Sequence, residues 1–437
     1  MLIEFTTKNF RSFRDETKLS MIATADKDNL DNIISMDKNK LKLLKSAVVY
    51  GSNGSGKSNL IKALNAMQSI VLSSSKEQRG DEIKDIDFFA FDIKDKKLPT
   101  LFEVIFIVDN IRYQYGFSAT KTKIYEEWLY SFPKAAKRTW FTRFLNEESD
   151  SYEWEYTDGK YLNANKDKMK LYIETTRDNE LFLSKIIQLN NKEAIPVFDW
   201  FKTELKCAGI EGWNDGESVT LDFLKSEDKK NLILGLMNDM GIQVNDIKTK
   251  EEKFDISKLN LEDEMPDELK QKIVHDLSDR SFVETKFLRK LKDEKMVALN
   301  LAEESDGTQK IFSLLGPFLD ALEKGYVVVM DELHNSLHPL LLKYLVSLFH
   351  NKDINTKNAQ LIFTTHETEI LNQDIFRRDQ IWFCDKDATF ASELIPLTDY
   401  KPRKSEKLSK GYLIGRYGGI PILEEDIKFS IKKIMGL

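Results

Sequence analysis

The stretch Ser46–Leu60, SAVVYGSNGSGKSNL, constrains the fold of this chain more than any other. The apolar run Ala47–Tyr50 is typical of a buried strand, and a helix-compatible segment begins near Lys57. The turn between them fits G-x-x-x-x-G-K-[ST], starting at Gly51 and ending at Ser58. Glycines in such a turn let consecutive backbone N–H groups point inward and form an anion-binding nest at a helix N-terminus. We therefore expect a strand–loop–helix unit that binds phosphate, rather than a Gly/Ser-rich surface turn that fits the pattern by chance.

This pattern assigns roles within the turn. Lys57 is expected to reach the β- and γ-phosphates of a nucleotide as a point charge, and the Ser58 hydroxyl to ligate Mg²⁺. The expected ligands are therefore ATP and Mg²⁺. The residues expected to bind the nucleotide here are Gly51, Ser52, Asn53, Gly54, Ser55, Gly56, Lys57, Ser58 and Asn59.

Two later segments also place polar residues directly after an apolar strand. Tyr326–Met330 ends in Asp331-Glu332, and Gln360–Thr364 ends in Thr365-His366. Ligands of open α/β sheets bind outside the carboxyl ends of the strands, so the three segments converge if their strands are neighbours. Asp331 would then hold Mg²⁺, Glu332 would deprotonate the attacking water, and His366 would contact the γ-phosphate. Taken alone, the acidic pair could be a helix N-cap and the histidine a strand-end residue satisfied by backbone.

Composition narrows the class of protein. The chain has 437 residues with a formal net charge of −7, which argues against a protein that coats nucleic acid but permits a local basic groove. Its two cysteines, Cys207 and Cys384, indicate a reducing compartment without a disulfide framework. The N-terminus does not resemble a secretory signal, and no apolar run approaches the ~18 residues that cross a bilayer. We expect a soluble cytoplasmic protein without membrane contact.

The remaining pattern predicts the arrangement around the phosphate-binding unit. Two strand-like runs flank Asp109-Asn110, which is a strong hairpin signal, and aromatic-rich strands over 124–143 extend it into an antiparallel β-layer. Helical spacing is expected over 171–205, at 221–240 and at 267–278, with β-like alternation over 282–301. The sequence contains no sustained heptad repeat, which excludes a long coiled coil. The expected domains are an N-terminal lobe over 1–189, a helical insertion over 190–283 and a C-terminal lobe over 284–437.

These motifs resemble those of a known family. GSNGSGKSN, SDGTQ, VVVMDE and TTH occur in the order found in ABC-type ATPases, and NFRSF near the start is similar to the RecF, SMC and OLD branch. EEWLY, ESDGTQK, DELHNSLHP, LIFTTHETEIL, RRDQIWF and GRYGGIP resemble bacterial RloA/AbiLi-type antiphage ATPases, to which AriA of the PARIS system looks related. The resemblance implies an α/β fold: an ABC-type P-loop nucleotide-binding domain with a mixed central sheet, an antiparallel β-layer and a helical insertion.

The resemblance further implies a signature segment, formed by Ser305, Gly307 and Thr308, that faces the γ-phosphate held by a second subunit. Two nucleotides would then be enclosed in a head-to-tail homodimer with twofold symmetry. Asp306 departs from LSGGQ-like patterns, and Ser336-Leu337-His338-Pro339 lacks the aspartate usual after the acidic pair, which puts the role of that loop in trans in doubt. Gln188 is the candidate for the glutamine that assists metal binding, although a helix-surface glutamine is the alternative.

The function expected from the resemblance is an ATP-driven switch in antiphage defence with a separate effector, an RloB-like or Toprim-type nuclease. The D-x-D pair Asp385 and Asp387 is better explained as a strand-end loop than as a nuclease metal site. The alternative is a RecF/SMC-like repair ATPase that binds DNA directly. Its candidate contacts are Lys134, Lys137, Arg138, Arg143, Lys401, Arg403, Lys404, Lys407 and Lys410, which could equally be solvated surface charges.

Overall fold

The structure is a computed structural model of the chain, and it describes all residues except 37–40, 92–97, 135, 158–159, 210–211, 214–215, 254–280, 405 and 422–437. The chain forms two compact units. The first comprises residues 1–213, 320–335 and 342–437, and the second comprises residues 214–319 and 336–341. None of the helices in the described part of the chain combines the length and apolar character needed to span a bilayer.

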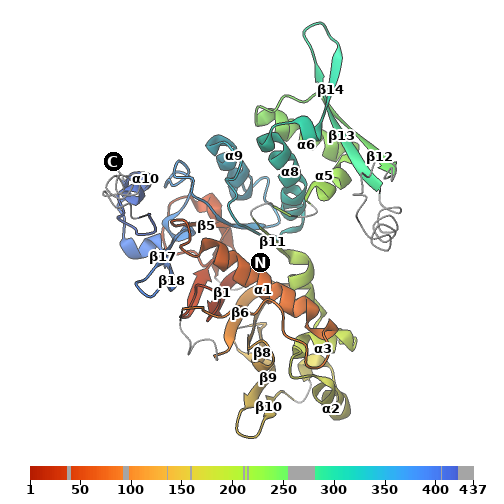
Figure 1. The fold of residues 1–437 in the computed structure, drawn as a ribbon, viewed down its shortest axis with the longest axis vertical. Coiled ribbons are helices and arrows are strands. Elements are labelled where there is room, and N and C mark those ends of the chain that lie inside the picture. The colour runs from red at the N-terminus through yellow and green to blue at the C-terminus, as the bar shows by residue number, and fades with distance from the viewer. Residues whose placement is uncertain are drawn as a thin grey trace, which may run out of the picture. The chain divides into compact units, whose positions relative to one another are not determined.

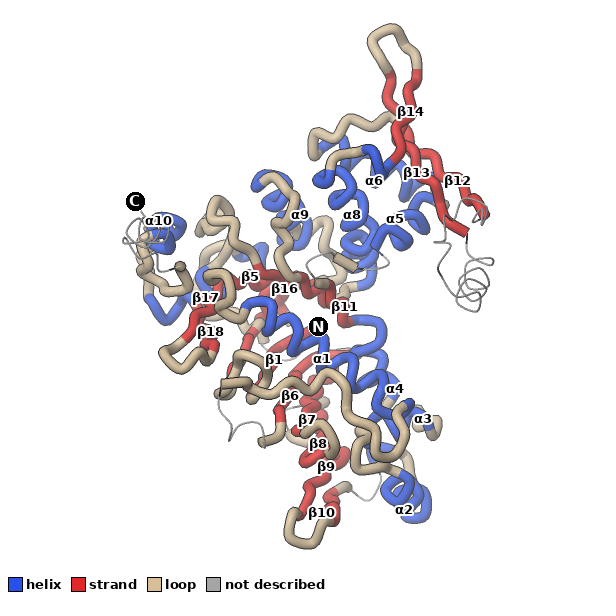
Figure 2. Tube along the Cα trace, in the orientation of Figure 1, coloured by secondary structure: helices blue, strands red, loops and turns tan. Residues whose placement is uncertain are grey.

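A six-stranded, mostly parallel sheet forms the centre of the first unit (Figures 1 and 2). Its strands, in spatial order, are β11 (Leu205–Ala208), β15 (Val327–Met330), β16 (Gln360–Thr364), β5 (Ser46–Tyr50), β17 (Ile381–Lys386) and β18 (Ser392–Pro396). Only β18 is antiparallel to its neighbour. Every residue of β5, β15 and β16 is buried, as expected for apolar strands covered on both faces. The three strands predicted to carry the site are therefore confirmed as adjacent neighbours.

A seven-stranded antiparallel sheet forms the second layer of this unit. Its strands, in spatial order, are β10 (Ser151–Glu155), β9 (Arg138–Asn146), β8 (Ile124–Phe132), β7 (Ile111–Ala119), β6 (Thr100–Val108), β1 (Leu2–Lys8) and β2 (Thr17–Ser20). The β6–β7 hairpin pairs Val108 with Ile111 across Asp109-Asn110. Both turn residues have positive φ, as the twist of a two-residue hairpin requires. The predicted antiparallel β-layer is confirmed.

One hydrophobic core joins the two sheets across α1 (Lys57–Ser73). It includes Val49 of β5, Leu60 and Met67 of α1, and Phe102 and Phe106 of β6. Removing these apolar side chains from water is the main force that holds β5 and α1 in place, and hence the turn between them. A small hairpin of β3 (Ile33–Ser35) and β4 (Lys42–Leu44) packs Ile34 and Leu43 in a separate cluster.

The segment predicted to have helical spacing over 171–205 is helical for most of its described length. It contains α3 (Phe182–Gln188), α4 (Ile195–Asp199) and a π-helical turn over Trp200–Glu204, preceded by α2 (Lys166–Thr175). The chain then enters β11, an edge strand of the parallel sheet that the sequence analysis did not predict. A four-residue strand with a lysine in it carries too little periodic signal to be recognised.

The second unit combines helices with a small sheet. Its elements are α5 (Gly216–Leu224), α6 (Glu227–Asp239), β12 (Asp246–Lys253), β13 (Ser281–Lys290), β14 (Met296–Asn300) and the N-terminal part of α8 (Asp306–Lys324). The helix predicted at 221–240 is two helices, and the β-character predicted at 282–301 is confirmed as β13 and β14. The helix predicted at 267–278 lies outside the described residues.

Thr220 enters the backbone ladder of α8 beside Pro317. Its hydroxyl accepts from the Gly316 N–H (3.0 Å) and donates to the Phe312 carbonyl (2.8 Å), which takes the place of the direct bond between those two residues. Gly316 is needed at this contact, because a Cβ there would lie 2.4 Å from the Thr220 nitrogen. The remaining described helices are α9 (Pro339–His350) and α10 (Leu408–Leu413). The predicted helix over 340–349 and the predicted helix end at Gly325 are both confirmed.

Candidate functional site

The turn between β5 and α1 has the geometry of an anion-binding loop. Helix α1 begins at Lys57, so its first N–H groups, which lack intrahelical partners, face the turn. A Cβ at Gly51 would lie 2.3 Å from the Cys384 carbonyl, and one at Gly56 would lie 2.2 Å from the Ser392 hydroxyl. Gly56 also has a φ of 118°. Neither position admits a side chain, so these two glycines are required by the packing of β17 and β18 behind the loop.

Lys57 lies inside the turn with its ammonium group held by the loop itself. Its Nζ donates to the carbonyls of Gly51 (2.9 Å) and Ser52 (3.0 Å), and the residue is 4% exposed. Burial lowers the pKa of Lys57, while Cys384, Glu332 and Asp331 oppose that shift. The ammonium is therefore a buried cation with two carboxylates in electrostatic range, placed where an anionic ligand of the loop would meet it.

Asp331 and Glu332 are held at the end of β15 by a residue of the neighbouring strand. The Thr364 hydroxyl donates to Asp331 Oδ1 (2.6 Å) and accepts from the Glu332 N–H (2.7 Å). Asp331 is buried, and Glu332 has a φ of 47°, a left-handed conformation that non-glycine residues seldom adopt. This backbone turn separates the two carboxylates, so that Asp331 stays packed against β16 and Glu332 is half-buried.

His366 faces Glu332 across the same edge. Its Nε2 lies 3.8 Å from Glu332 Oε1, and its ring centroid lies 5.7 Å from that of His334. Burial lowers the pKa of His366 to about 4, reinforced by Lys57 and His334 and opposed by Asp331. Burial also lowers the pKa of His334. Both imidazoles are consequently neutral near pH 7, and the contact between His366 and Glu332 is not an ion pair there.

The strand register brings these three groups to one edge. Thr364 pairs with Val49 and Met330 pairs with Phe363, so β5, β16 and β15 end side by side in parallel. The Thr365 N–H donates to the Val49 carbonyl (3.1 Å) just beyond the strand end. The glycine turn, the acidic pair and the histidine, which are far apart in sequence, therefore form one cluster.

The NFRSF segment completes the other side of the turn. Asn59 donates to the Ser12 hydroxyl (2.8 Å), and the Ser392 N–H donates to the Ser12 carbonyl (2.7 Å). A cavity of about 520 Å³ opens beside them, lined by Arg11, Ser12, Asn59, Asp87, Phe88, Ala90, Phe91, Lys121 and Lys386. Because Asn59 follows the loop directly, this cavity adjoins the phosphate-binding turn.

Comparison with known proteins identifies the family. The family described as "AAA domain, putative AbiEii toxin, Type IV TA system" matches residues 46–157 and 218–372, more than half of the chain. The chain belongs to this AAA domain family. Among solved structures, the SMC head domain from Thermotoga maritima is similar at 12% identity over 90% of this chain and 98% of that chain, with a TM-score of 0.40. No curated protein matches.

The family and the fold together make this a nucleotide-binding P-loop ATPase domain, as the sequence predicted. The residues present also fit Mg²⁺. The donor set of a buried Asp331 carboxylate and the Ser58 hydroxyl consists of oxygens, which Mg²⁺ prefers. Among the described residues no group of three or more His, Cys, Asp and Glu side chains forms a metal cluster, and Mg²⁺ in such sites relies instead on one or two carboxylates and the phosphates.

The proposed signature residues of the AAA domain lie in the second unit. Ser305 precedes α8, and its hydroxyl accepts from the Thr308 N–H (3.3 Å) and lies 3.0 Å from the Thr308 hydroxyl. A Cβ on Gly307 would lie 2.9 Å from the Ser336 carbonyl. Asp306 is exposed at the start of the helix. The segment thus presents hydroxyls and backbone N–H groups at a helix N-terminus, which suits an anion.

The structure contradicts Gln188 as a metal-assisting residue. Gln188 is exposed at the end of α3 and accepts from Lys185 Nζ (3.1 Å). In the same helix, Ser184 donates to the Val71 carbonyl (2.6 Å), close to the far end of α1. With a rise of 1.5 Å per residue, that end of α1 lies about 20 Å from Ser58. Gln188 is therefore a helix-surface glutamine, the alternative interpretation of the sequence.

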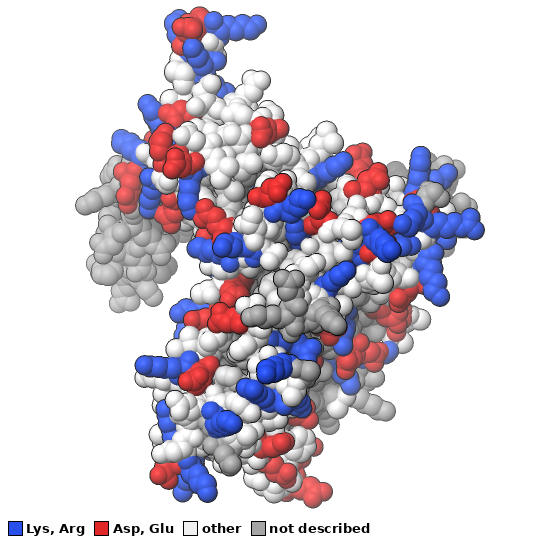
Figure 3. Space-filling view, turned by 180° about the vertical axis from the view of Figure 1, so that it is seen from behind, with Lys and Arg blue, Asp and Glu red and all other residues white. Residues whose placement is uncertain are grey.

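One expected DNA contact is also wrong. Arg143 is 2% exposed, where it pairs with the buried Glu127 (3.1 Å) and donates to the Glu180 carbonyl, so it cannot reach DNA. Glu127 also accepts hydrogen bonds from the Phe182 and Leu183 N–H groups, and these bonds help to offset the cost of burying the ion pair. The second cluster is on the surface, and its Lys404 pairs with Asp28 (2.7 Å). In Figure 3, acidic and basic side chains are interspersed over most of the visible face.

The D-x-D pair is a capped loop. Asp387 accepts from the N–H groups of Thr389 (2.8 Å) and Ala391 (2.9 Å), and Asp385 accepts from the Gly419 N–H (2.8 Å). The Asp387 carboxylate is thus occupied in a local turn, as the loop interpretation predicted, and that of Asp385 is bonded to the C-terminal segment.

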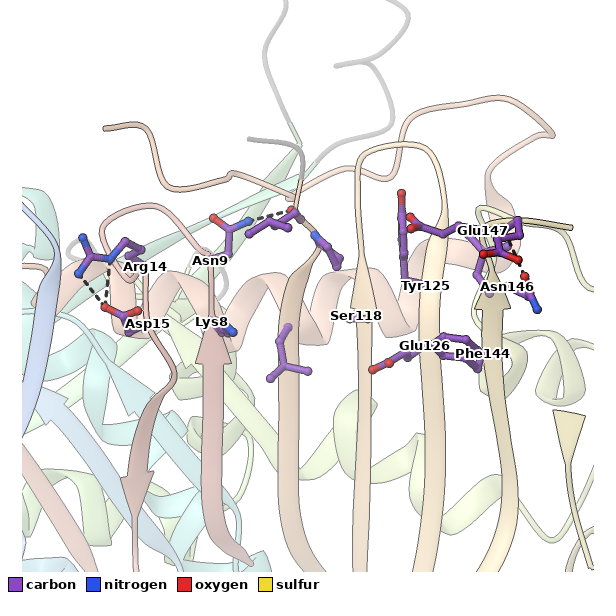
Figure 4. Close-up of a pocket in the computed structure, with 15 residues that line it drawn as sticks. Lys8, Asn9, Arg14, Asp15, Ser118, Tyr125, Glu126, Phe144, Asn146 and Glu147 are labelled. Atoms are coloured by element: carbon purple, nitrogen blue, oxygen red, sulfur yellow. Dashed lines mark hydrogen bonds and ion pairs between the residues drawn. The ribbon is translucent and has the colours of Figure 1, made fainter. Parts of the chain in front are cut away.

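A second cavity, of about 820 Å³, shares no residue with the glycine turn. It lies on the outer face of the antiparallel sheet, where Lys8, Leu101, Ser118, Glu126 and Phe144 form one row across β1, β6, β7, β8 and β9. Figure 4 shows these strands side by side. The described residues that line this cavity carry charges of both signs and include the exposed Phe144. They provide no paired nucleophile and base, so the cavity adds nothing to the strand-edge cluster.

Sequence reasoning missed two residues of the cluster. Thr364 organises both carboxylates, but it appears in sequence only as the last residue of an apolar strand. His334 lies beside His366, two positions after Glu332. A polar residue closing a buried strand, two positions before the candidate histidine His366, is the signal that could have found Thr364.

Proposed function

We propose that this AAA domain binds ATP and Mg²⁺, hydrolyses ATP, and acts as a dimeric switch that regulates a separate effector in antiphage defence. The observation that carries the proposal is the convergence of Lys57, Asp331–Glu332 and His366 at one edge of the parallel sheet. A buried cation and two carboxylates near a helix N-terminus are groups that phosphoryl transfer to water uses, and a neutral imidazole adds a hydrogen-bond donor.

The residues divide the chemistry among themselves. The N–H groups of the turn and Lys57 bind the β- and γ-phosphates, and Ser58 and Asp331 are the groups that would hold Mg²⁺. When bound, Mg²⁺ neutralises charge on the phosphate oxygens. Glu332 orients a water and takes its proton as the water oxygen bonds to the γ-phosphorus. The bond from that phosphorus to the bridging oxygen breaks, and ADP leaves. His366, neutral because of its lowered pKa, donates a hydrogen bond to the γ-phosphate.

Dimerisation would make this reaction a switch. The Ser305, Gly307 and Thr308 segment has the donors for a γ-phosphate held by a second subunit. The contacts of this segment with the γ-phosphate would exist only in the closed dimer, so ATP would favour that state more strongly than ADP does. Hydrolysis would then release the subunits. Because the loop after Glu332 has Ser336-Leu337-His338-Pro339, we assign it no role across the dimer.

The description of the family, which names a putative AbiEii toxin and a type IV toxin–antitoxin system, supports a role in defence. The RloA/AbiLi-like motifs support the same role with a separate effector, an RloB-like or Toprim-type nuclease. The burial of Arg143 weakens one of the two basic clusters on which direct DNA binding depends.

The test is a phage plaque assay on bacteria that express the chain together with its neighbouring genes. Lys57→Ala should abolish protection, whereas Lys62→Ala, an exposed lysine of the same helix, should retain it. Affinity purification with and without ATP should recover an effector in a nucleotide-dependent way. Protection by Lys57→Ala equal to that of the parent would refute the switch. Recovery of DNA with a steep salt dependence would favour the RecF/SMC-like alternative.

A further inference from the structure

The C-terminal segment returns to the phosphate-binding loop. Helix α10 places Tyr412 against β5 and β17, with its ring 5.8 Å from that of Tyr50 at the end of β5 and stacked at 5.4 Å on Phe383 of β17. The Tyr412 hydroxyl donates to the Gly419 carbonyl (2.8 Å). This segment includes GRYGGIP, which the ATPase chemistry above does not use.

Gly419 lies in direct contact with the first residue of the loop. A Cβ on Gly419 would lie 3.2 Å from Gly51 Cα and 3.2 Å from the Cys384 carbonyl. Gly418 and Gly419 have φ values of 66° and 64°, and the Gly419 N–H donates to Asp385 Oδ2 (2.8 Å). Two glycines in the left-handed region are what allows the backbone to approach the loop this closely.

Gly51 is held from both sides. On one side lies the backbone of Gly419, whose carbonyl accepts from the Tyr412 hydroxyl. Burial raises the pKa of that hydroxyl to about 12, and the nearby Gly51 backbone opposes the shift. On the other side, the Gly51 carbonyl accepts from Lys57 Nζ (2.9 Å). A continuous chain of contacts therefore runs from the phenol of Tyr412 through the backbones of Gly419 and Gly51 to the ammonium of Lys57.

Tyr417 provides a contrast within the same segment. Its ring also stacks on Phe383, at 5.2 Å, so it shares the packing of Tyr412. Its hydroxyl, however, donates to Glu406 and makes no described contact with the loop. The two tyrosines thus separate packing on Phe383 from the contact that reaches Gly51 through Gly419.

We propose that Tyr412 is a positioning residue of the nucleotide site, which fixes Gly51 and so couples ATP binding to the ordering of residues 408–420. The inference rests on the proposed function, because it requires that the Gly51–Lys57 loop binds ATP. Linkage is reciprocal, so ATP in the loop must stabilise the C-terminal segment by the same factor by which the ordered segment strengthens ATP binding.

The test compares Tyr412→Phe with Tyr417→Phe, each of which loses only a hydroxyl. Dissociation constants for ATP and Mg²⁺ are measured by calorimetry, with the free energy of unfolding without nucleotide as a second readout. Tyr412→Phe should weaken ATP binding roughly fivefold or more, the worth of one or two hydrogen bonds, while Tyr417→Phe retains parental affinity. Equal affinities in the two variants and the parent would overturn the proposal.

A measurement on the unmodified chain keeps the inference testable if Tyr412→Phe fails to fold. Hydrogen exchange of the amides over 408–420 should slow when ATP is added, and Lys57→Ala should abolish this protection. Unchanged exchange in a parent chain that binds ATP would overturn the coupling alone. A parent chain that does not bind ATP would instead refute the proposed function.

Discussion

The hydroxyl of Thr364 donates a 2.6 Å hydrogen bond to the buried carboxylate of Asp331. The same hydroxyl accepts from the Glu332 N–H, so one side chain fixes both the proposed metal ligand and the backbone of the proposed base. Two neighbouring strands thereby hold the acidic pair in a single arrangement, which the left-handed conformation of Glu332 would otherwise oppose.

Thr364→Val should slow Mg²⁺-dependent ATP hydrolysis about tenfold. Valine keeps the shape of threonine but leaves the partly buried Glu332 N–H and an oxygen of the buried Asp331 without this partner, a loss of roughly 1–3 kcal/mol for such groups. The measurement is the turnover rate as a function of Mg²⁺ concentration. Thr365→Val is the matched control, because the Thr365 hydroxyl accepts from the Glu367 N–H and makes no described bond to either carboxylate. Equal rates for both variants would contradict the role of Thr364.

Lys57→Ala should reduce ATP affinity by roughly a hundredfold while the fold is retained. The substitution removes the buried ammonium that the loop carbonyls hold, and a charge-assisted contact of this kind is worth about 1.5–3 kcal/mol. Binding of a fluorescent ATP analogue measures the effect, with the exposed Lys62→Ala as control. Unchanged affinity in Lys57→Ala would show that the nucleotide binds elsewhere.

Ser305→Arg should leave ATP binding intact and abolish dimer-dependent hydrolysis. Ser305 is exposed, so the bulky cation is tolerated in the folded chain, but it would block the approach of a second subunit's γ-phosphate to the start of α8. Turnover is measured as a function of protein concentration. The parent should show a rate per chain that rises with concentration, and the variant should not. Parental turnover in Ser305→Arg would rule out action across a dimer.

The stability of the chain should fall as the pH drops below about 6.5, partly through His350. Its Nε2 lies 2.8 Å from the Ser46 hydroxyl, and burial lowers its pKa to about 3, with Lys45 adding to the shift. Since the folded pKa lies below the unfolded value of 6.5, protons bind the unfolded chain preferentially. The contribution is complete above pH 6.5 and is lost as the pH falls toward 3.

At pH 5 this loss amounts to about 2 kcal/mol, at 1.36 kcal/mol per pKa unit. His350→Gln removes the titrating group and should therefore lose about 2 kcal/mol less than the parent between pH 7.5 and pH 5. Urea unfolding at the two pH values measures the difference. His366, whose pKa is also lowered, acts in the same direction in both proteins and cancels. Identical pH dependence in parent and variant would contradict this assignment.

The parts of the fold that local chemistry dictates could be predicted from the sequence. The Asp109-Asn110 hairpin, the glycine turn and the buried strands ending in Asp331 and Thr364 each follow from residue types that permit few conformations. The family match and the fold confirm the P-loop ATPase class predicted from them.

What could not be predicted depends on partners that are distant in sequence. Arg143 looked like a surface cation because its buried partner, Glu127, lies on the next strand. Gln188 was a candidate for the metal-assisting glutamine because sequence does not reveal that α3 packs near the far end of α1. β11 is too short to show periodicity and becomes a strand only through its pairing with β15.

The most direct test of the account is hydrolysis of radiolabelled ATP by the parent and by Glu332→Gln, with Glu369→Gln, an exposed glutamate of the loop after β16, as control. Removal of a general base is expected to slow turnover at least about a hundredfold while ATP affinity is kept, so Glu332→Gln should accumulate as an ATP-bound dimer. Glu369→Gln should hydrolyse ATP at the parental rate. If Glu332→Gln also turned over ATP at the parental rate, Glu332 would not be the base, and the strand-edge cluster would not be the catalytic site.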